Sequence, residues 1–275
     1  MKTAPETSAE KRIKFENPPV NELVIALFHL PLTELKAQHI GSYWDTIREK
    51  YPLCDQQPVV SSPDPQQQPF LEAPGELFPL PRFWFHNTTH PALIQVQRNA
   101  FMLNWRRSTA ALPDSQYPHY EAVAKDFWEE LENYKGYVQK AVGGKLDPIQ
   151  RCELTYVNII LPNELFANPA ELVNVLPSIA SLYDLQREDR QLAGIISTVV
   201  YSVNPTLLID LAIRLGRRPD TNEPAVILEL KAHGVPTDLS LEAARAWYGA
   251  AHDATYRLFL DATAQAMQEK IWKPR

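Results

Sequence analysis

The feature that most constrains the fold is a pattern that occurs twice along the chain. Residues 22–31 have the sequence ELVIALFHLP and residues 153–162 have ELTYVNIILP, so each half opens with an apolar, strand-like run that ends at a proline. In each half this run is followed by a helical stretch, further strand-like segments and a long amphipathic helix. We therefore predict an α+β fold with internally duplicated β-α-β-β-α units, each an antiparallel sheet with a long closing helix.

The order of these segments divides the 275 residues into a tail and two repeats. Residues 1–14 are polar and charged, and we predict a flexible tail there. The first α+β repeat spans residues 15–145, and the second spans residues 146–275. Within the first repeat, residues 56–81 are rich in proline and contain a run of three glutamines, which predicts a loosely docked loop with polyproline character.

Hydrophobic periodicity places the main elements of both repeats. In the first repeat we expect a helix within residues 32–51, strands at 83–85, 93–97 and 101–106, and a closing helix at 120–142. In the second we expect strands at 154–161, 194–203, 206–215 and 225–233, a helix start at 168–169, and a closing helix at 240–271. Trp44, Trp105 and Trp247 occupy periodic apolar positions and are predicted to lie in the core.

Composition narrows the functional classes. The net charge of −6 disfavours a nucleic-acid partner, because affinity for nucleic acid depends largely on neutralising phosphates. Two cysteines without ligand spacing predict neither a disulfide framework nor a metal site, and no cofactor is expected. No apolar run reaches the roughly 18 residues that span a bilayer, and residues 1–14 lack the apolar core of a signal peptide. We therefore expect a cytoplasmic protein with no membrane partner.

Catalytic signatures are missing from the sequence. There is no P-loop, no G-x-G-x-x-G, no G-x-S-x-G and no H-E-x-x-H, and only nine glycines occur in the chain. Asp126, Glu129 and Glu130 fall off the apolar stripe of their predicted helix, so they are expected to be solvated. We assign no catalytic residue, and the sequence favours a binding protein over an enzyme.

The densest polar cluster lies on two neighbouring predicted strands. Alternation places Gln95 and Gln97 on one face of the first strand, and Asn104 and Arg106 on one face of the second. These side chains are good hydrogen-bond donors for a polar ligand or a partner backbone. The alternative is that they only satisfy internal hydrogen bonds, for example through an ion pair of Arg106 with Glu22. The candidate ligand- or partner-binding residues are Gln95, Gln97, Asn104, Arg106, Glu22, Tyr156 and His252.

Two further hypotheses remain open at this stage. The first is an enzyme with a pocket between the repeats, built from Arg106, Asn104, Glu22, Tyr156 and His252. The second is a nucleic-acid-linked accessory protein that uses Arg98, Arg106, Arg107, Arg217 and Arg218. Convergence of the polar residues in one pocket would favour a ligand or enzyme site, whereas dispersal over loops would favour an interaction surface.

Several short blocks carry a resemblance to a known family. They are F-x-N-P-P-V-x-E from Phe15, Trp44 with Arg48, Tyr51-Pro52, Gln95-Val96-Gln97, Asn104-Trp105-Arg106, Tyr117-Pro118-x-Tyr120 and Tyr156-Val157-Asn158. On these blocks the chain resembles a sporadically distributed family of uncharacterised prokaryotic proteins of similar length. The resemblance implies no catalytic residue, and scattered occurrence suits an accessory role in defence or mobile-element systems. We predict a non-enzymatic binding or protein-interaction module whose partner is another protein or a small polar ligand.

Overall fold

The structure, a computed structural model, describes residues 13–60, 80–107, 116–167, 169–180, 189, 194–217 and 222–275. Contacts between Cα atoms divide the chain into two compact units. The sheet unit comprises Val20–Leu161 and Ile195–Arg257, and the terminal unit comprises Met1–Pro19, Pro162–Gly194 and Leu258–Arg275. Most of the predicted tail, residues 1–12, and most of the predicted proline-rich loop, residues 61–79, lie outside the described residues.

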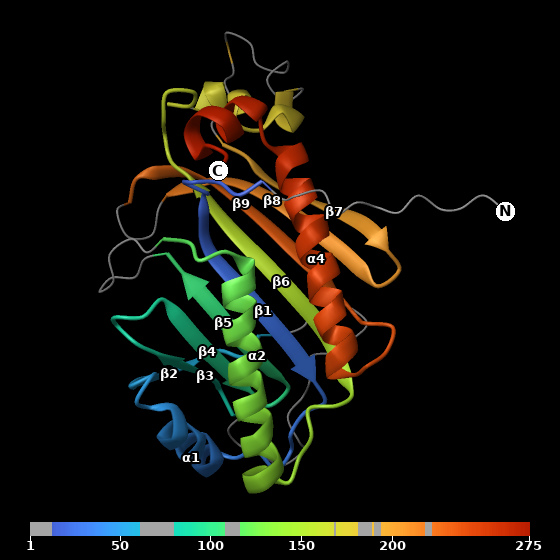
Figure 1. Ribbon diagram of the computed structural model, residues 1–275. Coiled ribbons are helices and arrows are strands. Elements are labelled where there is room, and N and C mark those ends of the chain that lie inside the picture. Colours follow the sequence, from blue (N-terminus) through green and yellow to red (C-terminus); the bar gives the residue numbers. More distant parts are fainter. Residues whose placement is uncertain are drawn as a thin grey trace, which may run out of the picture. The chain divides into compact units, whose positions relative to one another are not determined.

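The described part of the sheet unit contains a nine-stranded antiparallel sheet with the order β2-β3-β4-β5-β1-β6-β9-β8-β7 (Figure 1). Its strands are β1 Val20–His29, β2 Leu53–Gln57, β3 Arg82–His86, β4 Ala92–Gln97, β5 Ala100–Arg106, β6 Ile149–Ile160, β7 Ile196–Asn204, β8 Leu207–Arg217 and β9 Pro224–Gly234. Helices and an antiparallel sheet in one chain confirm the mixed α+β class. The sheet is shared by both predicted repeats, because β1 pairs with β6. Strand β1 is continuously apolar from Leu23 to Phe28, and most residues of β6 are buried, as suits two strands at the centre of a sheet.

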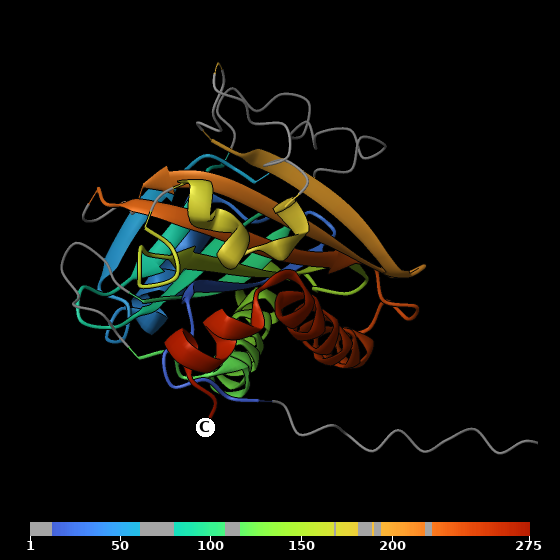
Figure 2. The same ribbon diagram turned by 90° about the horizontal axis from the view of Figure 1, so that it is seen from above.

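The long helices lie on one face of this sheet. These are α2, Tyr120–Tyr137, and the sheet-unit part of α4, Leu241–Ala262, which run along the same side in Figures 1 and 2. Tyr248 on α4 donates its hydroxyl to the backbone oxygen of Ala26 at 2.5 Å, and its ring meets Phe127 of α2 at 5.7 Å between centroids. The shorter helix α1 spans Ala37–Ile47. None of the helices in the described ranges has the length and apolar character that crossing a membrane requires.

The main differences from the predicted elements concern polar or irregular segments. Strand β2 was not predicted, because its sequence LCDQQ has no apolar alternation and it is held by backbone pairing with β3. Gln56 and Gln57 therefore belong to a strand and not to the predicted loop. Strand β6 begins five residues earlier than predicted, at Ile149, because it continues its pairing with β1. The last predicted helix is divided into α4 and a separate π-helical turn, Met267–Trp272.

Aromatic side chains fill the space between the sheet and its helices. Tyr134 of α2 lies over Phe101 of β5, with ring centroids 5.2 Å apart, and Tyr43 of α1 meets Tyr134 at 5.1 Å. Trp105 and Trp247 are buried as predicted, whereas Trp44 is half-buried and donates its indole N–H to the backbone oxygen of Tyr51. These rings account for much of the apolar area that the sheet unit buries.

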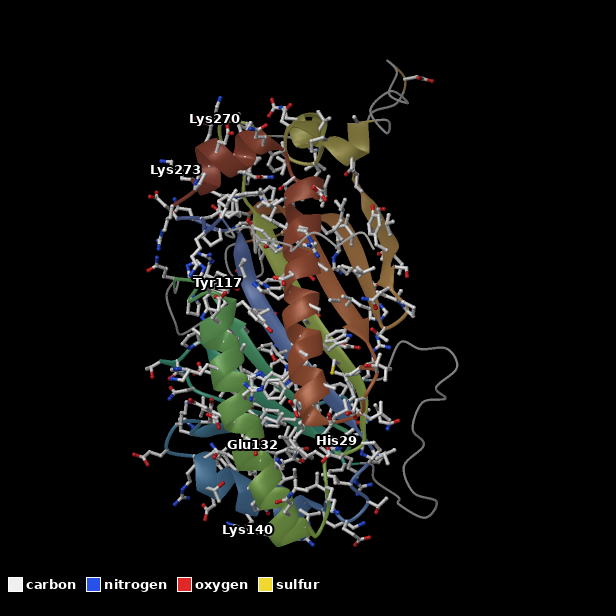
Figure 3. The ribbon with its side chains drawn as sticks, turned by 45° about the vertical axis from the view of Figure 1, so that its right-hand side comes forward. His29, Tyr117, Glu132, Lys140, Lys270 and Lys273 are labelled. Atoms are coloured by element: carbon white, nitrogen blue, oxygen red, sulfur yellow. The ribbon has the colours of Figure 1, made fainter. Side chains whose placement is uncertain are left out.

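His29, labelled in Figure 3, is the last residue of β1 and is also buried.

The terminal unit has an aromatic cluster of its own. Phe15 contacts Phe259 at 6.5 Å and Trp272 at 5.9 Å between ring centroids. The backbone nitrogen of Arg275 donates to the oxygen of Lys14 at 2.7 Å, so the last residues of the predicted tail, 13–14, adjoin the C-terminal segment.

Candidate functional site

The register of the sheet assigns its side chains to two faces. Directly paired residues of an antiparallel sheet point to the same face, and alternate residues of a strand point to opposite faces. Leu23 pairs with Trp105 on the face that α2 and α4 cover. Val24 pairs with Asn104 and with Thr155 on the other face, which we call the polar face. Gln95, Gln97, Asn104, Arg106 and Glu22 all belong to the polar face.

A cavity of about 340 Å³ opens on the polar face. Its polar lining consists of Glu22, Arg82, Gln95, Asn104, Arg106 and Thr155, with Glu153 at its edge on β6. Four of the predicted candidate residues therefore line one cavity. The volume lies at the lower end of the range of about 300–1,000 Å³ that is typical of small-molecule sites.

The cavity wall contains a continuous chain of hydrogen bonds. Arg82 Nη1 donates to Gln95 Oε1 at 2.7 Å, and Trp84 Nε1 donates to the same oxygen at 2.9 Å. Gln95 Nε2 then donates to Asn104 Oδ1 at 2.5 Å, and Asn104 Nδ2 donates to Glu22 Oε1 at 2.6 Å. Each amide uses its oxygen as an acceptor and its nitrogen as a donor, so the chain fixes the orientation of both amides.

Two arginines flank an indole ring at this wall. The guanidinium carbons of Arg82 and Arg106 lie 5.5 and 5.7 Å from the ring centre of Trp84. Arg106 is the cross-strand neighbour of Glu22, but no ion pair joins them, and the buried Nε atoms of both arginines have no hydrogen-bond partner among the described residues. The expected internal pair of Arg106 with Glu22 is thus not formed in the described part of the chain. Two positively charged groups face the cavity with donor capacity left over.

Burial shifts the titration of Glu22, one of the two acids that line the cavity. The pKa of Glu22 is raised, chiefly because burial disfavours the charged carboxylate, although the hydrogen bond from Asn104 and the charge of Arg106 act in the opposite direction. A carboxyl group with a raised pKa is ionised over a narrower pH range, so it neutralises less of the positive charge of Arg82 and Arg106. Glu153, the other lining acid, pairs with Arg151 and Lys231, so no acid of the described residues forms an ion pair with Arg82 or Arg106.

The other end of the cavity is apolar. Ala26, Phe28 and Met102 form a small buried cluster on the polar face, and Val60 packs against it. Gln97 holds Val60 in place: its Oε1 accepts from the backbone nitrogen of Val60 at 3.0 Å, and its Nε2 donates to the backbone oxygen at 3.1 Å. Gln97 therefore lies on the polar face but anchors a segment of chain and does not line the cavity.

Tyr156 and His252 lie on the opposite face from the cavity. Tyr156 pairs with Leu23, on the face that the helices cover. Its hydroxyl is 2.8 Å from Nδ1 of His252 on α4, and the imidazole stacks on Tyr120 with centroids 4.0 Å apart. The structure therefore groups Glu22, Gln95, Asn104 and Arg106, and places Tyr156 and His252 in a separate cluster of aromatic rings.

The arginines of the nucleic-acid hypothesis are not grouped on one surface. Arg98 is buried and donates to the backbone oxygen of Leu35, and Arg107 donates to that of Val20. Arg217 donates to the backbone oxygen of Asn222, and Arg218 lies outside the described residues. Apart from Arg106, the described members of this set donate to backbone oxygens of the chain itself.

Some contributors to the cavity were missed from the sequence. Thr155 and Glu153 were not singled out, because they reach the cavity through the pairing of β6 with β1, which is distant in sequence. Arg82 was not singled out, because it begins a short strand directly after the proline-rich segment. Glu130 was expected to be solvated but is 5% exposed, accepting from Lys50 Nζ at 2.7 Å and from the hydroxyl of Tyr51 at 3.1 Å. The periodicity of a helix reports only the face that its own apolar residues define.

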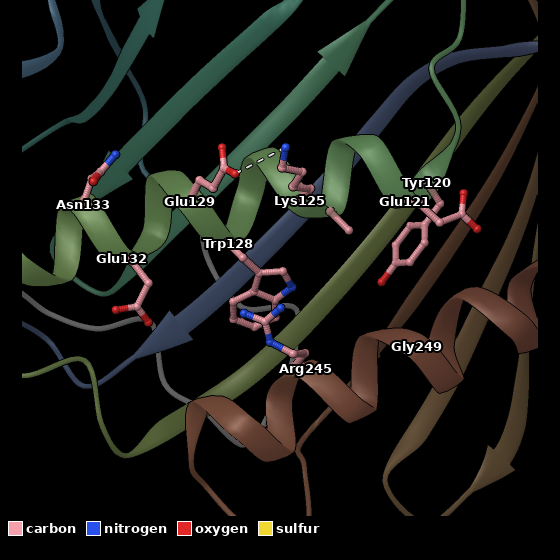
Figure 4. Close-up of a pocket in the computed structure, with 10 residues that line it drawn as sticks. Tyr120, Glu121, Lys125, Trp128, Glu129, Glu132, Asn133, Arg245 and Gly249 are labelled. Atoms are coloured by element: carbon pink, nitrogen blue, oxygen red, sulfur yellow. Dashed lines mark ion pairs between the residues drawn. The ribbon is translucent and has the colours of Figure 1, made fainter.

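A second hollow of about 980 Å³ lies between α2 and α4 (Figure 4). Arg245 lies 4.2 Å above the ring of Trp128, and Lys125 forms an ion pair with Glu129 at 3.7 Å. Both cations are thus engaged within the hollow, and we assign no ligand to it. The described residues contain no group of three or more His, Cys, Asp or Glu side chains that could hold a metal ion.

Comparison with known proteins adds no relative: no protein-family model, no curated protein and no solved structure matches the chain. The resemblance described above therefore stays a prediction that rests on its own sequence blocks.

Proposed function

We propose that this chain is a non-enzymatic binding module that holds a small anionic molecule in the cavity of the polar face. The observation that carries the proposal is the pair of guanidinium groups, Arg82 and Arg106, beside the indole of Trp84. Neither arginine has an acidic partner among the described residues. A guanidinium presents its donors in a planar fork that fits a carboxylate or a phosphate, so an anion is the complement of this wall.

The two ends of the cavity define the form of the ligand. Its anionic group would lie against Arg106 and Arg82, within reach of the polar wall of Gln95, Asn104 and Glu22. Its body would extend toward Met102, Ala26 and Phe28, which supply apolar contact. The ligand class is therefore a compact organic anion with a short apolar body, for which the volume of about 340 Å³ is sufficient.

Binding is favoured over catalysis by the state of the polar wall. Both amides are fixed in a chain that ends on Glu22, which makes them rigid recognition groups. The enzyme hypothesis needed Tyr156 and His252 in the same pocket, and their place on the helix-covered face removes its main support. The cytoplasm and an accessory role in defence or mobile-element systems remain the proposed setting.

We further propose that the two halves of the sheet derive from one duplicated unit. The order β2-β3-β4-β5-β1 in the first half has its counterpart in β7-β8-β9-β6 in the second, and β1 and β6 meet at the centre. Val24 pairs with Thr155, Leu23 with Tyr156 and Ile25 with Leu154. These pairs are symmetric when the halves are matched with Pro31 on Pro162, which supports a two-fold relation between the halves.

Isothermal titration calorimetry on the full chain tests the binding proposal with benzoate and hexanoate as probes. Benzamide and hexanamide have nearly the same shape without the charge, so they separate anion recognition from apolar contact. We expect the anions to bind at least about tenfold more tightly than the amides, since a charge-assisted hydrogen bond contributes on the order of 1.5–3 kcal/mol. Anions and amides of equal affinity, or no anion binding below about 10 mM, would contradict the proposal.

Arg106→Lys then distinguishes a ligand contact from a structural role. Lysine keeps the charge but loses the planar fork, so we expect benzoate affinity to fall about tenfold with the melting temperature unchanged. The matched control is Arg48→Lys at the exposed C-cap of α1, where the arginine forms a surface ion pair with Asp45. A less stable Arg106→Lys protein with wild-type affinity per folded molecule would show that Arg106 only supports the fold.

A further inference from the structure

The outermost strand on one side of the sheet, β7, has an unusual edge. It spans nine residues, Ile196–Asn204, and among the strands of the described residues it pairs on one side only, with β8. Its apolar side chains are exposed on both faces: Ile196 is 91% and Val200 58% exposed on the polar face, while Val199, Tyr201 and Val203 are 43–45% exposed on the other face. The outer backbone groups of such a strand are a template for a further strand.

The opposite edge of the same sheet is built differently. Strand β2 has five residues, of which Asp55, Gln56 and Gln57 are polar. Oδ2 of Asp55 lies 2.6 Å from Nε2 of His86. Short length and charge are common devices that keep an edge strand from pairing with another chain. Strand β7 has neither device, because residues 194–209 contain no charged side chain. The contrast within one sheet indicates that β7 has a pairing partner.

We propose that this partner is a second copy of the chain, with the two β7 strands antiparallel about a two-fold axis at Val200. In that register Val200 faces Val200 of the second copy, and Val199 faces Tyr201 of the second copy on the helix-covered side. Thr198 faces Ser202 on the polar side. β-Branched and aromatic side chains directly opposite each other stabilise an antiparallel pair, so Val199, Val200 and Tyr201 each gain an apolar neighbour. Ile196 and Val203 face Asn204 and Ser197 of the second copy in this register.

A second copy fits this edge better than a foreign strand. The occupant needs apolar side chains on both faces and no charge to match, and the sequence ISTVVYSVN meets these conditions itself. A two-fold pairing also closes both β7 edges at once, which leaves only the two protected β2 strands at the ends of the joined sheet. A foreign strand would leave the stoichiometry open and would need the same uncommon pattern.

Sedimentation velocity and light scattering on the full chain test the proposal. The chain has a mass of 31.3 kDa, and we expect the wild type at about 50 µM to have twice that mass. Val200→Lys places two ammonium groups opposite each other at the axis, so we expect its dimer to dissociate at least tenfold more readily. Two matched controls should stay dimeric: Val200→Thr, which keeps the branched shape without charge, and Gln56→Lys on the other edge.

Because Val200 is mostly exposed, Val200→Lys is expected to fold, which circular dichroism and the melting temperature check. If that variant fails to fold, amide hydrogen exchange of the wild type replaces it: residues 197–203 should exchange more slowly at high than at low protein concentration. A wild type that is monomeric at about 100 µM, a dimer that Val200→Lys leaves intact, or exchange independent of concentration would each overturn the proposal. None of these outcomes depends on ligand binding in the cavity.

Discussion

His29 gives the sharpest quantitative prediction, because its burial converts directly into a dependence of stability on pH. The side chain is 1% exposed at the end of β1, and Nδ1 donates to the backbone oxygen of Leu30 at 2.8 Å. Nε2 is buried with no hydrogen-bond partner among the described residues. Protonation would add a second buried N–H without an acceptor. Burial accordingly lowers the pKa of His29 from 6.5 to about 4.

The sign and size of the effect follow from proton linkage. The unfolded chain binds a proton at His29 near pH 6.5, and the folded chain binds it only near pH 4. The stability that the neutral imidazole contributes is therefore complete above about pH 6.5 and is lost as the pH falls toward 4. The two pKa values give a loss of roughly 2 kcal/mol in the free energy of unfolding between about pH 7.5 and pH 5.

Urea denaturation followed by circular dichroism at several pH values between about 7.5 and 5 measures this loss. His29→Asn keeps an N–H donor near the position of Nδ1 but does not titrate. Its stability deficit relative to the wild type should shrink by roughly 2 kcal/mol over that range. His39→Gln, on half-buried α1, is the matched control and should keep the wild-type slope. If the wild type and His29→Asn lose stability in parallel, His29 is accessible to protons and the reasoning fails.

Three further changes test the packing and electrostatics of the sheet. Burial raises the pKa of Glu22, so the folded protein loses stability as the pH rises through the folded pKa and the carboxyl group ionises. Glu22→Gln does not ionise. Its urea midpoint should therefore exceed that of the wild type near pH 8 and match it in acid. Trp105→Ala removes a ring that is 4% exposed and 5.2 Å from Tyr117, so unfolding should become easier by about 3–5 kcal/mol; an unchanged melting temperature would refute core packing. Tyr248→Phe loses the bond to the Ala26 oxygen, and calorimetry should record a loss of about 1 kcal/mol or more.

The local part of this fold could be predicted from the sequence. The apolar runs of β1 and β6, the polar–apolar alternation of β4 and β5 and the stripe of α2 each follow from a periodicity within one segment. The shared face of Gln95 and Gln97, and that of Asn104 and Arg106, follow in the same way. These predictions succeed because a strand or helix with one buried face must repeat its apolar residues at the period of its backbone.

Long-range pairing could not be predicted in the same way. That β1 pairs with β6, and so joins the strands of both repeats into one sheet, depends on residues about 130 positions apart. Thr155 and Glu153 reach the cavity only through this pairing, and Tyr156 is directed away from it. A shift of one residue in the register would have exchanged these roles, and no local pattern fixes that register.

Comparison of matched positions explains why the cavity lies on one side of a nearly symmetric sheet. With the proposed matching, Glu22 corresponds to Glu153, and their neighbours on the next strand are Arg106 and His233. In the second half the charges are closed internally: Glu153 pairs with Arg151 at 2.7 Å and with Lys231 at 2.9 Å, and His233 lies 3.1 Å from Asp210.

In the first half Glu22 meets the neutral amide of Asn104, which leaves the guanidinium of Arg106 without an acid among the described residues. The same position of the sheet therefore supplies a self-neutralised ion-pair network in one half and, in the other, the wall that we propose binds an anion. Lys231 matches Asn104 of the first half. Lys231→Asn would therefore introduce the same amide and leave Glu153 in an ion pair with Arg151 alone. Under the proposed duplication, differences at a few polar positions are therefore sufficient, in physical terms, for the proposed site to occur in one half and not in the other.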